Sequence, residues 1–146
     1  MKFKKYPKRD PIKNYFPLPN EIFCLGLFPG EISVYSYLLY CEDRKTFQCY
    51  PSYRTIGNAL KISKNTVRKY VSGLEEKGLI TTEPTKIIKS NGMKYNGNLM
   101  YTIRSIEEAK DKYLQSQLGQ AELAMAQANA KRQLEEYDRK NRSKAV

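Results

Sequence analysis

The side chains that can recognise a polyanion are concentrated in one stretch, Lys64 to Ser72. Lysine and arginine donate hydrogen bonds to phosphate and to guanine, and asparagine pairs with adenine through two hydrogen bonds. Apolar side chains at Val67, Val71 and Leu74 have helical spacing, so the stretch is predicted to be a helix with a polar face opposite its apolar face. Such a helix can read the major groove. The residues expected nearest the bases are Lys64, Asn65, Thr66, Arg68 and Lys69, and Ser63 and Ser72 are placed in the same contact set.

A second, shorter helix is expected directly before this one. Pro51 pushes its predecessor out of the helical region, and Ser52 can cap a helix that runs to Leu60. The tight turn over residues 61–63 then links the two helices. Free N–H groups at the start of the shorter helix suit a backbone phosphate, so Ser52 and Arg54 are further candidate DNA contacts. Helix capping alone is the alternative role of Ser52.

A β-hairpin is predicted after the second helix. Its two apolar, β-branched runs cover residues 79–88 and 98–104, and they are separated by the turn signals Asn91-Gly92 and Asn96-Gly97. The expected tip, residues 89–96, carries Lys89 and Lys94, which can reach the minor groove or its phosphates. A solvated loop without a partner is the alternative interpretation of this tip.

The remaining segments complete a domain plan of three parts. Residues 1–17 are expected to form a flexible basic arm, in which Lys2, Lys4, Lys5, Lys8 and Arg9 can contact DNA, although disorder without function explains them as well. Residues 18–104 are expected to form the folded domain, with a core helix near residues 31–43. Residues 105–146 read as one long polar helix. A short heptad seam predicts a homodimer through residues 105–142, and an exposed helix that frays is the alternative. The seam consists of Leu114, Leu118, Ala121, Met125 and Ala128.

Composition excludes several function classes. The chain has 146 residues and a net charge of +11, which favours a polyanionic partner. It contains no histidine, and its three cysteines lack paired spacing, so we expect no metal site, no cofactor and reduced, core or semi-buried thiols. No catalytic residues are predicted, because neither a nucleophile with a base nor a phosphate loop is present. The chain has no apolar run long enough to cross a bilayer and no signal segment, so a cytoplasmic protein without membrane contact is expected.

The segment from Pro51 to Ile80 resembles winged helix-turn-helix regulators of the GntR and MarR kind. The residues that carry this resemblance are Ile56, Ala59, Leu60, Ile62, Ser63, Thr66, Val67, Arg68, Leu74, Gly78, Leu79 and Ile80. The chain is also similar to the N-terminal module of replication initiators from plasmids and conjugative elements. The resemblance implies an α+β fold, a three-helix core plus a β-hairpin wing with a long C-terminal helix. It also implies sequence-specific binding of double-stranded DNA by a transcriptional regulator or an accessory factor of a mobile element. A replication initiator-like module and a winged helix used for protein interaction are the alternatives.

Overall fold

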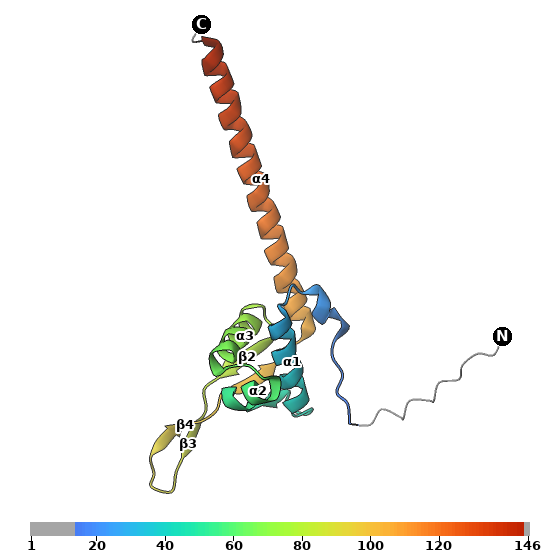
Figure 1. The fold of residues 1–146 in the computed structure, drawn as a ribbon, viewed down its shortest axis with the longest axis vertical. Helices are drawn as coiled ribbons and strands as arrows, with labels where there is room; N and C mark the ends of the chain where they lie inside the picture. Colours follow the sequence, from blue (N-terminus) through green and yellow to red (C-terminus); the bar gives the residue numbers. More distant parts are fainter. Residues whose placement is uncertain (1–13, 145–146) are drawn as a thin grey trace, which may run out of the picture.

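The computed structural model describes residues 14–144 of the chain. Three helices form the core: α1 (Pro29–Cys41), α2 (Tyr53–Leu60) and α3 (Lys64–Glu76), preceded by the short 3-10 helix η1 (Asn20–Cys24). The long helix α4 (Ile106–Lys144) follows the strands and ends the described part of the chain (Figure 1). The lysines and the arginine predicted to form a basic arm, at positions 2 to 9, lie outside the described residues.

The core fills the space between the three helices and the sheet. Val34 and Leu38 of α1, Ile56 of α2 and Val67 of α3 are each completely inaccessible to solvent. The apolar spacing predicted for α3 is therefore the face that packs inward, since Val71 and Leu74 are buried beside Val67. Burial of such side chains is the main favourable contribution to folding.

Four of the five strands build the predicted hairpin, which is divided into two small sheets. Strands β2 (Ile80–Glu83) and β5 (Met100–Ile103) pair at its base, and β1 (Gln48–Cys49) adds to the other side of β5. Strands β3 (Lys86–Ile88) and β4 (Lys94–Asn96) form a separate antiparallel ribbon, drawn in yellow tones in Figure 1. This order confirms the α+β winged helix-turn-helix fold. The division falls at Pro84, which has no N–H to donate to a sheet.

Two details of the strands differ from the sequence-based predictions. The tip of the wing is shorter than predicted, because residues 94–96 form β4 and the chain turns at Asn91-Gly92 instead. The signal at Asn96-Gly97 lies at the division between the two sheets, where the Gly97 N–H donates to the Thr85 carbonyl oxygen at 2.8 Å. The second difference is β1, which was not predicted.

The helix-turn-helix is fixed by local hydrogen bonds. The Ser52 hydroxyl accepts from the Thr55 N–H at 3.0 Å, and the Ser63 hydroxyl accepts from the Thr66 N–H at 3.2 Å. Each serine is thus the N-cap of its helix, α2 and α3 respectively. Between them Lys61 adopts a left-handed conformation with φ +62°, which ends α2 and lets the chain turn within three residues.

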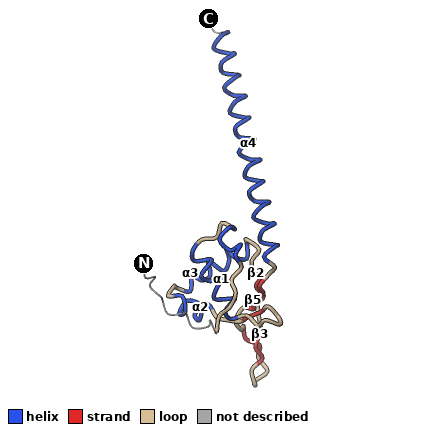
Figure 2. The backbone as a smooth tube through the Cα atoms, turned by 90° about the vertical axis from the view of Figure 1, so that its right-hand side faces the viewer, coloured by secondary structure: helices blue, strands red, loops and turns tan. Residues whose placement is uncertain are grey.

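Helix α4 packs on the domain only through its first turns. Ala109 is buried, and Ile106 and Tyr113 pack against the core. Beyond them the helix projects away from the domain, as both views show (Figures 1 and 2). With 39 residues the helix is about 58 Å long. No helix within residues 14–144 is both long and apolar enough to cross a membrane.

The cysteines only partly match the expected burial. Cys49 is buried and Cys41 is half-buried, but Cys24 is exposed, so the expectation of core or semi-buried thiols is wrong for Cys24. Cys24 belongs to η1, a short 3-10 helix whose one buried residue is Ile22.

Candidate nucleic-acid interface

The polar face of α3 is open to solvent. Lys64, Asn65, Arg68, Lys69 and Ser72 are all exposed, while the apolar residues between them are buried. The side chains on this face are an amide, three cations and a hydroxyl. Because these groups are exposed on one face of a helix, they can exchange water for base edges and phosphates without rearrangement of the core.

Ser63 and Thr66 are partly committed to the structure of the helix itself. Their hydroxyl oxygens lie 2.8 Å apart and share a hydrogen bond, and Ser63 also accepts from the backbone. The same arrangement joins Ser52 to Thr55 at the start of α2. These serines therefore position the two helix N-termini, and only their remaining hydrogen-bonding capacity is available to a ligand.

A cation–π contact joins a side chain of α2 to a side chain of α3. The Arg68 guanidinium lies over the Tyr53 ring, 5.8 Å from its centroid. This cation–π contact orients the Arg68 guanidinium toward α2. Arg54, in the first turn of α2, is exposed.

The two lysines predicted for the wing tip do not share a face of the ribbon. Lys94 lies opposite Ile88 in the register of β3 and β4, whereas the Lys89 ammonium lies 4.4 Å from the centroid of the Tyr95 ring. Successive residues of a strand point to opposite faces, so Lys94 and Tyr95 define two different faces. Lys94 belongs to β4 and Lys89 directly follows β3, and the ribbon of these two strands projects away from α3 (Figure 1).

The cations of this surface are not neutralised by the domain. Within residues 14–144 the ion pairs are Lys77–Glu31, Arg104–Glu108 and Lys110–Glu107, none of which includes a cation of α2, α3 or the wing. Two more exposed cations belong to the same surface and were missed from the sequence. They are Lys61, in the turn between α2 and α3, and Lys86, on the Lys94 face of the ribbon. The turn itself was predicted, so the position of Lys61 within it was the available signal.

Helix α3 is held against α1 by two close approaches over glycines. The Glu31 carboxylate of α1 lies over Gly73, where an added Cβ would stand 2.2 Å from Oε2. The Tyr70 ring of α3 lies over Gly30, where an added Cβ would stand 2.1 Å from a ring carbon. A methyl group at either glycine would therefore require the Glu31 carboxylate or the Tyr70 ring to move from its place at the crossing of α1 and α3.

One oxygen of the buried Glu31 carboxylate at this crossing accepts two hydrogen bonds. Glu31 is only 2% exposed, and its Oε1 accepts from the Phe28 N–H at 2.8 Å and from the Lys77 ammonium at 2.6 Å. The ammonium also lies 4.6 Å from the centroid of the Phe28 ring. A buried charge requires such partners, because an unpaired one would be costly. The end of α3 is thereby tied to the start of α1.

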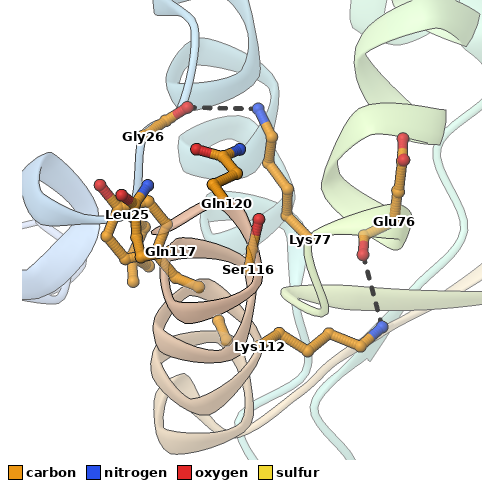
Figure 3. Close-up of a pocket in the computed structure, with 10 residues that line it drawn as sticks. Leu25, Gly26, Glu76, Lys77, Lys112, Ser116, Gln117 and Gln120 are labelled. Carbon is orange, nitrogen blue, oxygen red and sulfur yellow. Dashed lines mark hydrogen bonds between the residues drawn. The ribbon is translucent and has the colours of Figure 1, made fainter. Parts of the chain in front are cut away.

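A second connection ties the end of α3 to α4. Lys112 of α4 donates to the Glu76 carbonyl oxygen at 3.4 Å, and Lys77 donates to the Gly26 carbonyl oxygen at 3.3 Å (Figure 3). Cations at the last carbonyls of a helix are favourable because the C-terminus carries partial negative charge. The two lysines border a pocket of about 400 Å³ that Ser116, Gln117 and Gln120 also line. The pocket therefore lies where the end of α3 meets α4.

The fold and this surface define a winged helix-turn-helix protein. The family model described as a helix-turn-helix domain matches residues 25–80, from the segment before α1 to the first residue of β2. This part of the chain is therefore similar to helix-turn-helix domains, and the elements around it complete a winged helix-turn-helix fold. Residues 14–144 contain no group of three or more cysteine, aspartate or glutamate side chains able to hold a metal ion.

The chain is also similar to solved structures. One is a possible transcriptional regulator from Methanosarcina mazei Go1, which is 20% identical, with a TM-score of 0.47. The match covers 79% of this chain and 98% of that one. At this distance the likeness carries no functional argument. No curated protein matches the chain.

Proposed function

We propose that this protein binds double-stranded DNA in a sequence-specific manner, with α3 as the recognition helix in the major groove. The observation that carries the proposal is the division of α3 into a buried apolar face and an exposed face with Asn65, Arg68 and Lys69. An α-helix fits the major groove, and amide and guanidinium groups distinguish adenine and guanine there. In this geometry the N-terminal end of the helix lies nearest the bases, which is where Lys64 and Asn65 stand.

The other cations are proposed to contact the DNA backbone. Arg54 and Lys61 flank the recognition helix, and Lys86, Lys89 and Lys94 lie on the ribbon. Contacts to phosphates fix position and orientation but read no sequence.

The biological role proposed is that of a transcriptional regulator or an accessory factor of a mobile element. The resemblance to GntR- and MarR-like regulators and to replication initiator modules supports this role. A dimer through α4 would place two recognition helices on a two-fold site, as expected for regulators that bind palindromes. The exposed apolar side chains of α4 support the dimer, including Leu114, Leu118 and Met125, each between 57% and 67% exposed.

Substitutions in α3 and in the wing test the division between base and backbone contacts. Selection from a random DNA pool at about 0.15 M salt would first give the preferred site, because affinity without a stated salt concentration cannot be interpreted. Asn65→Ala and Arg68→Ala are each expected to cost about 1–3 kcal/mol at that site and to relax its selectivity. Lys94→Ala should weaken binding to preferred and random duplexes by the same factor.

Titration of each variant against both duplexes by fluorescence anisotropy provides the measurement. A matched control is Lys140→Ala, which removes an exposed cation from the far end of α4. If Arg68→Ala lowered affinity for preferred and random duplexes equally, α3 would not be the reading element. If no variant differed from the control, this surface would not be the DNA-binding surface.

A further inference from the structure

The ribbon of β3 and β4 carries large apolar side chains in exposed positions. Ile87, Ile88 and Met93 are between 54% and 68% exposed, and Tyr95 is 39% exposed. The ribbon projects from the rest of the domain, so these side chains lie apart from its core (Figures 1 and 2). Single apolar side chains are common at protein surfaces, but a group of them on one projecting element indicates a contact surface.

Three of these four side chains are grouped on one face of the ribbon. Ile87 lies opposite Tyr95 in the strand register, and the Tyr95 hydroxyl donates to Met93 Sδ at 3.8 Å. The Lys89 ammonium lies over the same tyrosine ring. Ile88 belongs to the other face, because successive residues of a strand point to opposite faces. At 68%, Ile88 is also the most exposed of the four.

The neighbours of Ile88 on its own face are polar. Lys94 lies directly opposite Ile88, and Lys86, two residues earlier in β3, lies opposite Asn96. Residues directly opposite in an antiparallel pair are about 5 Å apart, and residues two positions apart in a strand are about 7 Å apart. This face therefore presents one aliphatic side chain beside two cations and an amide.

The charge of the wing favours a polyanion as the partner of this face. Residues 84–103 contain three lysines and no aspartate or glutamate. A second copy of the ribbon would be repelled by this charge, whereas phosphates attract it. The minor groove of DNA is about 6 Å wide and is bordered by a row of phosphates on each side. Because Lys86 and Lys94 belong to different strands of the ribbon, they can reach the two rows while Ile88 faces the floor of the groove.

We propose that Ile88 enters the minor groove of bound DNA and inserts between two neighbouring base pairs, so that the wing bends the duplex. Apolar side chains inserted in this way partly unstack a base step and kink the duplex by about 20–90°. A ribbon with side chains on both faces is about 10 Å thick, so the groove has to widen around it, and the kink provides that widening. The inference rests on the proposed DNA binding and adds a change in the shape of the DNA.

Energy transfer between dyes at the two ends of the preferred duplex tests the bend. The full-length chain is added to saturation, which anisotropy verifies in the same samples. The unsubstituted chain should raise the transfer efficiency by the amount that a kink of about 20–90° produces. Ile88→Ala should still form the complex but leave the duplex nearly straight, and Ile88→Leu should keep the bend. Ile87→Ala is the matched control, because it makes the same change on the opposite face, and it should bend the duplex as the unsubstituted chain does.

2-Aminopurine placed at successive positions of the duplex locates the unstacked step, since its fluorescence rises when stacking is lost. The rise is expected with the unsubstituted chain and with Ile87→Ala, and it should be absent with Ile88→Ala. Both alanine variants are expected to fold, because the residues of β3 are exposed.

Three results would overturn the inference and leave the proposed function standing. They are a straight duplex in the saturated complex, an unchanged bend with Ile88→Ala, and equal loss of the bend with Ile87→Ala. An oligomer that forms without DNA and is lost in Ile88→Ala would assign this face to a protein contact and would also overturn the inference. Absence of any bound duplex would overturn the proposed function together with the inference.

Discussion

The buried side chain of Cys49 makes the stability of this fold depend on pH. The thiol is 4% exposed and lies 3.6 Å from the Leu38 carbonyl oxygen. Burial raises the pKa of Cys49 to about 12 from its ordinary value of 9.0. Burial likewise raises the pKa of Tyr35 to about 12 from 10.0. The folded protein therefore retains these protons over a pH range in which the unfolded chain releases them.

Stability is accordingly expected to fall in alkaline solution. Both folded pKa values are raised, so the stabilisation is complete below the unfolded pKa and is lost as pH rises toward the folded pKa. The thiol alone should lower the free energy of unfolding by about 1 kcal/mol between pH 8 and pH 10. Urea unfolding across this range measures the effect. Cys49→Ser removes this titration, so a parallel fall in the variant would contradict the assignment to Cys49.

At the residue scale, the sequence predicted the exposed side chains of α3 better than it predicted the contacts that hold α3 in place. Asn65 and Lys69 follow from helical spacing alone, because an apolar face implies its opposite. The role of Glu31 could not be predicted, since it depends on Lys77, which is 46 positions away. In the sequence Glu31 reads as an ordinary polar residue in the first turn of a helix.

At the scale of elements, the crossing of α1 and α3 determines how the exposed face of α3 is presented. Both helices were predicted from local signals, namely caps and apolar spacing. Their close approach rests on Gly30 and Gly73, and a glycine inside a helix gives no sequence signal for which neighbour lies above it. Strand β1 was missed for a similar reason, because it forms through pairing with β5, about 50 positions later.

A methyl group at Gly73 should disturb the packing of α1 against α3. Alanine favours a helix by up to about 1 kcal/mol over glycine, but here its Cβ would displace Glu31 from its two bonded donors. Gly73→Ala is therefore expected to lower the free energy of unfolding by about 1–3 kcal/mol in urea titrations.

Gly119→Ala provides the matched control for that substitution. Gly119 also lies inside a helix, but an added Cβ there would meet nothing within 4 Å. Its circular dichroism should show equal or greater helicity, with no loss of stability. Stabilisation by Gly73→Ala would show that the crossing has room that the structure does not display.

At the scale of the whole molecule, α4 holds its C-terminal end far from the domain. Leu118 and Met125 lie on the predicted seam, whereas Leu123 lies on the other side of the helix, and all three are exposed. The sequence predicted the helix and its apolar seam, but such a seam does not identify the surface that packs against it. Arg132 and Glu135 continue the seam with charges, so the proposed contact is confined to its first half.

Paired lysine substitutions test whether that seam forms the proposed dimer. Sedimentation velocity should show a dimer for the unsubstituted chain and a monomer for Leu118→Lys with Met125→Lys, because buried charges at such positions are unpaired. Leu123→Lys should remain dimeric. A monomer at all concentrations of the unsubstituted chain, or equal dissociation in Leu123→Lys, would contradict a dimer through this seam.

The break in the wing at Pro84 has a consequence for variation among such chains. Hydrogen bonds at Gly97 and Thr85 connect the distal ribbon to the base, and the residues of β3 and β4 are exposed. Insertions or deletions near its tip therefore leave the register of β2 and β5 unchanged. The ribbon of β3 and β4 can therefore vary in length to suit a ligand, while the pairing of β2 with β5 stays the same.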